Sequence, residues 1–80
     1  MNSRNAMNSK NATVFTSIIG SWRNGSLSDA ARQIRALTKY QVASLLVHGW
    51  MCEAGWVFIG NPGLEGDFQR FVLDSLESKD

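Results

Sequence analysis

The chain has 80 residues, which is enough for one small domain and too few for a second, and its 44% hydrophobic and 19% charged content is typical of a globular protein. One cysteine and one histidine exclude an internal disulfide and a closed Cys/His metal site. No apolar run is long enough to cross a bilayer and no signal peptide is recognisable, so we expect a cytoplasmic protein without a membrane partner.

The charge is divided unevenly along the chain, although the net charge is only +1. Residues 1–50 carry six Lys or Arg and one Asp, a formal charge of +5. Residues 51–80 carry two Lys or Arg and six Asp or Glu, a formal charge of −4. A basic half of this kind indicates a surface that faces a polyanion, although short chains also acquire such a division by chance.

The N-terminal residues differ in character from the rest of the chain. Residues 1–11 are polar, rich in Asn and Ser, and without hydrophobic periodicity. This pattern predicts a flexible N-terminal arm, followed by a single domain over residues 12–80.

A first helix is predicted near residues 13–24, because one apolar stripe recurs there at helical spacing. The stripe consists of Val14, Phe15, Ile18, Ile19 and Trp22. Thr13 is expected to cap the start of this helix, and Asn24 with Gly25 to stop it. The β-branched residues leave a strand as the alternative.

Ser26 and Asp29 have the spacing of a capping box, in which a hydroxyl at the cap is followed three residues later by a carboxylate. They predict a second helix over about 27–36. Its inner face is expected to contain Leu27, Ala30, Ala31 and Ile34, and its outer face Arg32, Gln33 and Arg35.

A third helix is predicted over about 39–48, with Thr38 as its N-cap. The inner stripe consists of Val42, Leu45 and Leu46. At 100° per residue, the opposite face carries Tyr40, Ala43, Ser44 and Val47. Gly49 is expected to end the helix in the left-handed conformation.

Two apolar runs, 50–52 and 56–59, flank a three-residue loop that ends in Gly55, which predicts a β-hairpin. The alternative extends the third helix to about residue 54 and leaves only 56–59 as a strand. The segment 60–63, with the sequence GNPG, predicts a turn.

A C-terminal amphipathic helix is predicted over roughly 65–77. Its apolar face consists of Leu64, Phe68, Phe71, Val72 and Leu76. This face is large for so small a domain to cover, so we predict a homodimer formed through residues 64–77.

Residues 30–46, with the sequence AARQIRALTKYQVASLL, carry a resemblance to a known family. They resemble the second and third helices of winged helix-turn-helix DNA-binding domains, with small residues in the second helix, Thr at the turn and a Val-x-x-Leu-Leu inner stripe. The tetrad 38–41 is also similar to that of small fimbrial-operon regulators. The resemblance covers residues 13–60 and implies a mainly α fold with a small β-hairpin, in which three helices and a wing are followed by a C-terminal helix.

The resemblance also implies a function, that of a small DNA-binding transcriptional regulator or accessory factor. The small size of the chain suggests a plasmid or phage origin. The helix that begins at Lys39 would read double-stranded DNA in the major groove. Base contacts require polar side chains at the tip of that helix, and phosphate contacts require cations, hydroxyls and helix N-terminal amides. The expected DNA-binding residues are Arg23, Arg32, Arg35, Thr38, Lys39, Tyr40, Gln41 and Ser44.

No residue pattern predicts catalysis, so we expect no enzyme, no cofactor and no metal site. His48 has no acid or cysteine pattern to orient it, and Cys52 lies in an apolar context typical of a buried thiol.

Protein interaction is the alternative hypothesis for the function. Three tryptophans, Trp22, Trp50 and Trp56, are more typical of a core than of a ligand platform. Together with the phenylalanines they are numerous enough to leave an exposed aromatic patch, expected around Trp50, Trp56 and Phe58. A protein of this kind would be an inhibitor from a phage or mobile element that docks on a host protein.

Overall fold

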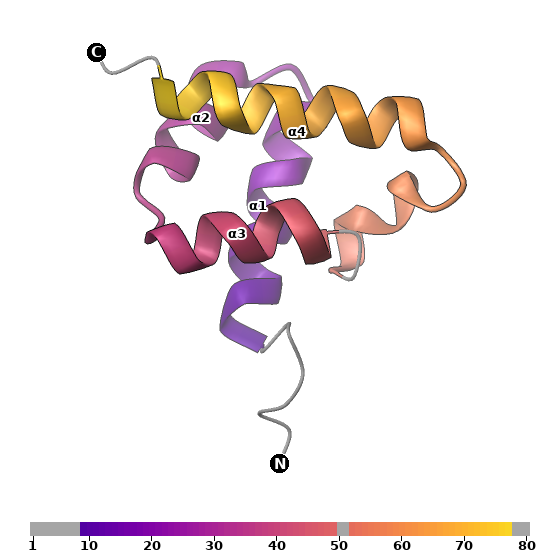
Figure 1. The fold of residues 1–80 in the computed structure, drawn as a ribbon, viewed down its shortest axis with the longest axis horizontal. Helices are drawn as coiled ribbons and strands as arrows, with labels where there is room; N and C mark the ends of the chain where they lie inside the picture. The colour runs from indigo at the N-terminus through magenta and orange to yellow at the C-terminus, as the bar shows by residue number, and fades with distance from the viewer. Residues whose placement is uncertain (1–8, 50–51, 78–80) are drawn as a thin grey trace.

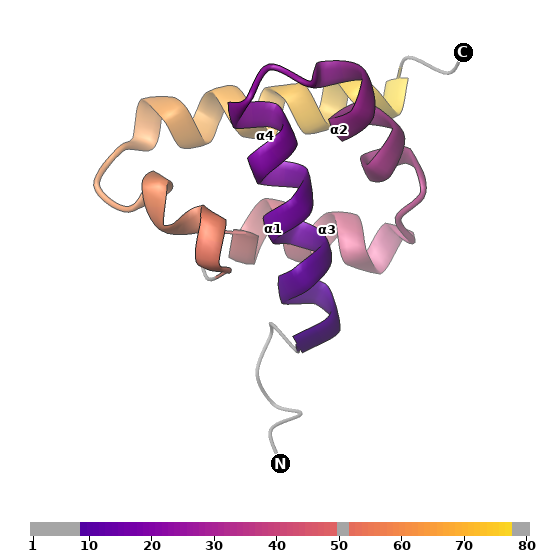
Figure 2. The same cartoon turned by 180° about the vertical axis from the view of Figure 1, so that it is seen from behind.

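The computed structural model describes residues 9–49 and 52–77, and all regular structure within these ranges is helical. The elements in chain order are α1 (Ser9–Arg23), α2 (Leu27–Arg35), α3 (Lys39–His48), the 3₁₀ helix η2 (Glu53–Phe58) and α4 (Pro62–Glu77). Helix α1 is central, because both α2 and η2 pack against it, and α2 also packs against α4. Helices α3 and α4 lie on the same side of α1 and run in opposite directions (Figures 1 and 2).

The predicted winged helix-turn-helix fold is wrong, because residues 9–49 and 52–77 contain no strand and therefore no wing within the predicted hairpin. The predicted hairpin residues that are described form η2 instead. The alternative, a third helix that extends to residue 54, is also wrong, since α3 ends at His48. Residues 50 and 51, which both hypotheses include, lie outside the described residues.

Tertiary contacts explain why this apolar segment forms a 3₁₀ helix. A two-stranded hairpin is marginal on its own and requires a covered face. Here the amide and the thiol of Cys52 both donate to the Gly49 carbonyl, at 3.3 and 3.1 Å, and the chain turns. The turn places the Phe58 ring 6.3 Å from Trp22 and 5.3 Å from Phe68. Burial of Phe58 between α1 and α4 therefore determines the conformation.

The ends of α1 agree in part with the prediction. The helix begins at Ser9, so it includes the last three residues of the predicted arm, and residues 1–8 lie outside the described residues. At its C-terminus Gly25 adopts a φ of 87°, and the Ser26 amide donates to the Ser21 carbonyl at 2.9 Å. This is a Schellman motif, and it confirms the predicted stop at Gly25.

The caps of α2 and α3 differ from each other. Thr38 caps α3 as predicted, with its hydroxyl accepting from the Gln41 amide at 3.1 Å and its own amide donating to the Gln41 side chain at 3.0 Å. The capping box predicted at Ser26 is wrong, because the Ser26 side chain makes no cap hydrogen bond. The left-handed cap predicted at Gly49 is also wrong, since its φ is −58° and the chain continues into a tighter turn.

The core lies where α1 meets the other helices, and its side chains are apolar and almost fully buried. It contains Phe15, Ile18, Ile19, Ile34, Leu45, Cys52, Phe58, Phe68 and Val72. The predicted inner stripes of the first and C-terminal helices are the main contributors, which confirms their helical periodicity. In the second helix Ala30 and Ile34 are buried as predicted, but the prediction for Leu27 is wrong, since it lies exposed at the start of α2.

Candidate interaction surface

Two of the predicted phosphate-binding arginines, Arg23 and Arg35, lie at different ends of α4. Arg23 lies at the end of α1 beside Leu64, at the start of α4. Arg35 lies at the end of α2, where its guanidinium donates to the Ser75 carbonyl of α4 at 3.4 Å. Leu64 and Ser75 are eleven residues apart on one helix, a separation of about 16 Å along its axis. The two arginines therefore lie near opposite ends of α4.

Arg32, the third predicted phosphate contact, points outward from α2 and forms an ion pair with Asp29. Asp29 also accepts a hydrogen bond from Gln33, at 3.4 Å. Asp29 is the only acidic residue among residues 9–49. Arg32 is thus already paired with the one carboxylate that the first three helices contain.

Two of the predicted base-reading residues, Gln41 and Ser44, make interactions within the molecule. The Gln41 side chain completes the capping box with Thr38, and its amide group also donates to Asn11 of α1 at 3.3 Å. Ser44 is half-buried and makes an interaction within the molecule. The polar side chains available at the tip of the helix are therefore reduced to those of Lys39 and Tyr40.

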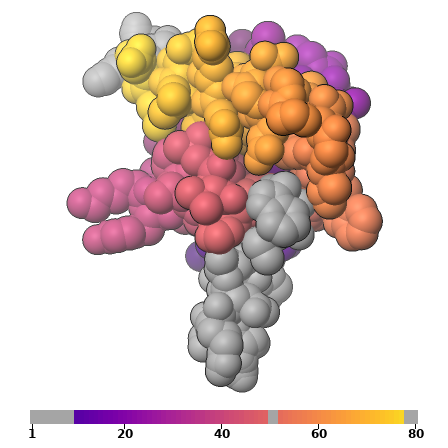
Figure 3. All heavy atoms as spheres, turned by 45° about the vertical axis from the view of Figure 1, so that its right-hand side comes forward, coloured from indigo at the N-terminus to yellow at the C-terminus, as the bar shows by residue number. Residues whose placement is uncertain are grey.

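Lys39 and Tyr40 are exposed next to each other, and the Lys39 ammonium lies 5.5 Å from the centre of the Tyr40 ring. This is within the range of a cation–π contact. Side chains in the magenta region, which includes the start of α3, project from the surface of the molecule (Figure 3). Both of these predicted contact residues are accessible to solvent.

The outward-facing side of α3 is apolar. Tyr40 is 77% exposed and Val47 is 60% exposed, and Ala43 lies exposed between them. We refer to these three residues as the α3 outer face. Their spacing of three and four residues places them on one stripe opposite the buried Leu45.

Leu73 adds a further exposed apolar side chain on α4, where 51% of it is accessible. It lies outside the buried stripe that contains Phe68 and Val72. Helical spacing at 100° per residue placed Ala43 and Val47 opposite the inner stripe of α3, but neither was among the predicted site residues. Leu73 could have been found in the same way, as an apolar residue outside the predicted stripe of α4.

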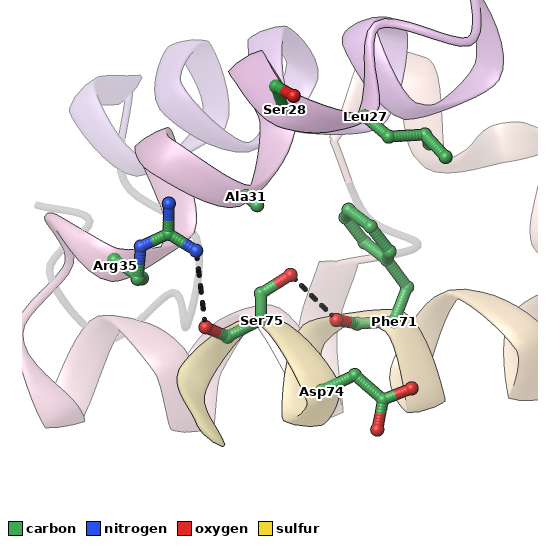
Figure 4. A pocket seen from close by; sticks show the side chains of 7 residues that line it. All are labelled: Leu27, Ser28, Ala31, Arg35, Phe71, Asp74 and Ser75. Atoms are coloured by element: carbon green, nitrogen blue, oxygen red, sulfur yellow. Dashed lines mark hydrogen bonds between the residues drawn. The ribbon is translucent and has the colours of Figure 1, made fainter. Parts of the chain in front are cut away.

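A shallow hollow of about 390 Å³ lies between α2 and α4 (Figure 4). Its polar groups are largely bonded to each other, since Arg35 donates to the Ser75 carbonyl and the Ser75 hydroxyl donates to the Phe71 carbonyl at 2.8 Å. The Asp74 carboxylate points away from the Arg35 guanidinium. The hollow thus lacks the convergent free polar groups typical of a small-molecule site.

The aromatic patch expected around Trp50, Trp56 and Phe58 is not present in that form. Phe58 is buried in the core, Trp56 is exposed, and Trp50 lies outside the described residues. Trp22 packs in the core as expected, with its ring 5.0 Å from that of Phe68.

Within 9–49 and 52–77, no group of three or more His, Cys, Asp or Glu side chains is arranged to hold a metal ion. Cys52 is buried, and its thiol donates to a backbone carbonyl. His48 is half-buried at the end of α3. None of the helices in these ranges combines the length and apolar character needed to span a bilayer.

Comparison of the chain with protein-family models, curated proteins and solved structures finds no match.

Proposed function

We propose that this protein is a small protein-interaction module, and that the α3 outer face is its binding surface. The observation that carries the proposal is the exposure of Tyr40 and Val47 on one stripe of a helix whose opposite side forms the core. A helix on the surface of a soluble domain normally presents charged and polar residues to water. An apolar outward stripe is typical of a helix that is covered by a partner.

DNA reading, the other hypothesis, has less support from the same helix. A recognition helix requires polar side chains near its N-terminus and cations around it. The α3 outer face offers Ala43 and Val47, and Gln41 is engaged in the helix cap. The separation of Arg23 from Arg35 along α4 divides the expected phosphate contacts.

Photo-crosslinking tests the proposal at single positions. The Tyr40 side chain is replaced by p-benzoylphenylalanine, and a matched variant carries the same group at Arg32, which is also exposed but lies on the charged side of α2. We expect covalent protein adducts from position 40 and none from position 32 when the chain is irradiated in the cells that produce it. Mass spectrometry of the adducts gives their composition. Equal adducts at both positions, or none at either, would contradict the proposal.

A second measurement separates the two hypotheses. Fluorescence polarisation with pooled duplex DNA fragments at low salt is expected to detect no binding. Binding that is weakened by Lys39→Ala and by Arg35→Ala, in variants that remain folded, would replace the proposal with the DNA-reading hypothesis. Phosphate contacts of this kind weaken steeply as salt rises, so a high-salt series identifies them.

A further inference from the structure

We infer that the partner of the α3 outer face is a second copy of the chain, with α3 of each copy packed on α4 of the other. This inference rests on the proposed interaction function and names its partner. Closed two-fold dimers are the commonest assemblies of soluble proteins, and each requires a surface that is complementary to itself. The relative direction of α3 and α4 and the charges at their ends point to a face of this kind.

The arrangement of the two helices supplies the geometry. Helices α3 and α4 lie on the same side of α1 and run antiparallel (Figures 1 and 2), and a hydrogen bond from the Gln69 side chain to the Leu46 carbonyl joins them. A two-fold axis that runs between them, parallel to both, exchanges their positions in the facing copy. Each α3 then lies over the α4 of the partner, again antiparallel, and the contact occurs twice.

A hydrogen bond within one copy fixes which residues are level with each other. The Gln69 side chain donates to the Leu46 carbonyl at 3.1 Å, so these two positions lie at the same height along the antiparallel pair. Val42 is four residues before Leu46 on α3, and Leu73 is four residues after Gln69 on α4. Leu73 is therefore level with Val42, next to Ala43. Because the two-fold axis preserves this level, Leu73 of the partner meets Tyr40 and Ala43.

The same register brings opposite charges together at the end of the contact. Lys39 begins α3 and is exposed. It is seven residues before Leu46, which makes it level with position 76 and within about one residue of Glu77, which ends α4 and is also exposed. The positive N-terminal end of the α3 dipole faces the negative C-terminal end of α4 in the partner, which favours the same pairing. Complementary charges of this kind set register and exclude wrong partners.

The charge division along the sequence extends this complementarity. Residues 9–49 contain one acid, Asp29, and it is paired with Arg32, whereas α4 carries more acids than bases and ends in the exposed Glu77; Asp74, another of its acids, lies on the side that lines the hollow beside α2. A copy that placed α3 on the partner's α3 would bring the two basic halves together. Pairing α3 with α4 places a basic element on an acidic one in both halves of the dimer.

The size of the contact also favours two helix pairs over one. Helix α3 has 10 residues and is about 15 Å long. A single pair of such helices covers less than the roughly 800 Å² per partner of a standard stable interface. Two symmetric α3–α4 pairs double the buried area, and they cover both Tyr40 and Leu73.

Charge reversal in a mixing experiment tests the arrangement. In Lys39→Glu, positions 39 and 77 are both acidic, and in Glu77→Lys they are both basic, so each variant alone places like charges in both contacts. When the two variants are mixed, every contact between different chains pairs opposite charges. We expect a wild-type dimer in sedimentation equilibrium at tens of micromolar, roughly tenfold or greater weakening in each variant alone, and recovery in the mixture.

Two further variants make the test independent of the charges. Leu73→Ser is expected to weaken the dimer, and Arg32→Ser, at an exposed position of α2 outside the proposed contact, to leave it unchanged. Circular dichroism shows whether each variant is folded. A wild-type chain that sediments as a monomer at these concentrations, or charge variants that do not recover on mixing, would overturn the inference. If purified protein is monomeric but position 40 crosslinks to a different protein in cells, the interaction function remains and only the identity of the partner is wrong.

Discussion

Helices α2 and α3 are neighbours in the chain and similar in length, but they present different faces to the outside. Helix α2 buries Ala30 and Ile34 and carries the Asp29–Arg32 ion pair on its outer side. Helix α3 buries Leu45 and carries Tyr40 and Val47 on its outer side. The inner faces serve the same purpose, whereas the outer side of α2 carries an ion pair and the outer side of α3 is apolar.

Each of the two helices also has a glutamine whose side chain bonds to α1. Gln33 of α2 accepts a hydrogen bond from Ser17 at 2.9 Å and donates to Ser21 at 3.4 Å, so two residues of α1 hold it. Gln41 of α3 bonds Asn11 and the helix cap. In both helices a glutamine fixes the rotation of the helix against α1. The apolar stripe of α3 is therefore held outward by specific contacts.

The largest expected effect concerns the inner faces, where the two helices are alike. Ile34→Ala and Leu45→Ala each remove a buried side chain, so each should lower the free energy of unfolding by about 2–5 kcal/mol. Urea denaturation followed by tryptophan fluorescence measures this loss. A much smaller loss in Leu45→Ala than in Ile34→Ala would mean that α3 is only loosely attached to the core.

An intermediate effect distinguishes the starts of the two helices. Thr38→Ala removes the cap hydrogen bond of α3 and should lower the free energy of unfolding by about 1 kcal/mol. Ser26→Ala removes a side chain that makes no such bond, and should change it by only a few tenths of a kcal/mol. The same denaturation experiment compares the two variants. Equal losses would contradict the difference between the caps.

The four α-helices were predictable because each carries an apolar stripe with the period of a helix. The 3₁₀ helix η2, which stands where a wing was predicted, was not predictable. Residues 56–59 are apolar without periodicity, and their conformation depends on the contact of Phe58 with Trp22, far away in the chain. The outer position of Tyr40, Ala43 and Val47 followed from helical spacing alone. The separation of Arg23 from Arg35 did not, because it depends on how α1 and α2 pack against α4.

The smallest expected effect on stability concerns the outer faces, where the two helices differ most. Val47→Ser and Arg32→Ser both change exposed side chains, so each should alter the free energy of unfolding by less than about 0.5 kcal/mol when measured at a concentration where the chain is monomeric. At higher concentration the two variants should separate. A partner that covers Val47 stabilises the folded chain by mass action, and Val47→Ser removes part of that gain.

The concentration dependence of the unfolding midpoint is therefore the decisive comparison between these two variants. For wild type and Arg32→Ser the midpoint should rise with protein concentration, because association is linked to folding. For Val47→Ser it should rise less, since an apolar contact is lost from each half of the interface. If the three midpoints respond equally to concentration, Val47 is solvent-exposed in the assembled protein, and the outer faces of α2 and α3 do not differ in the way that their side chains indicate.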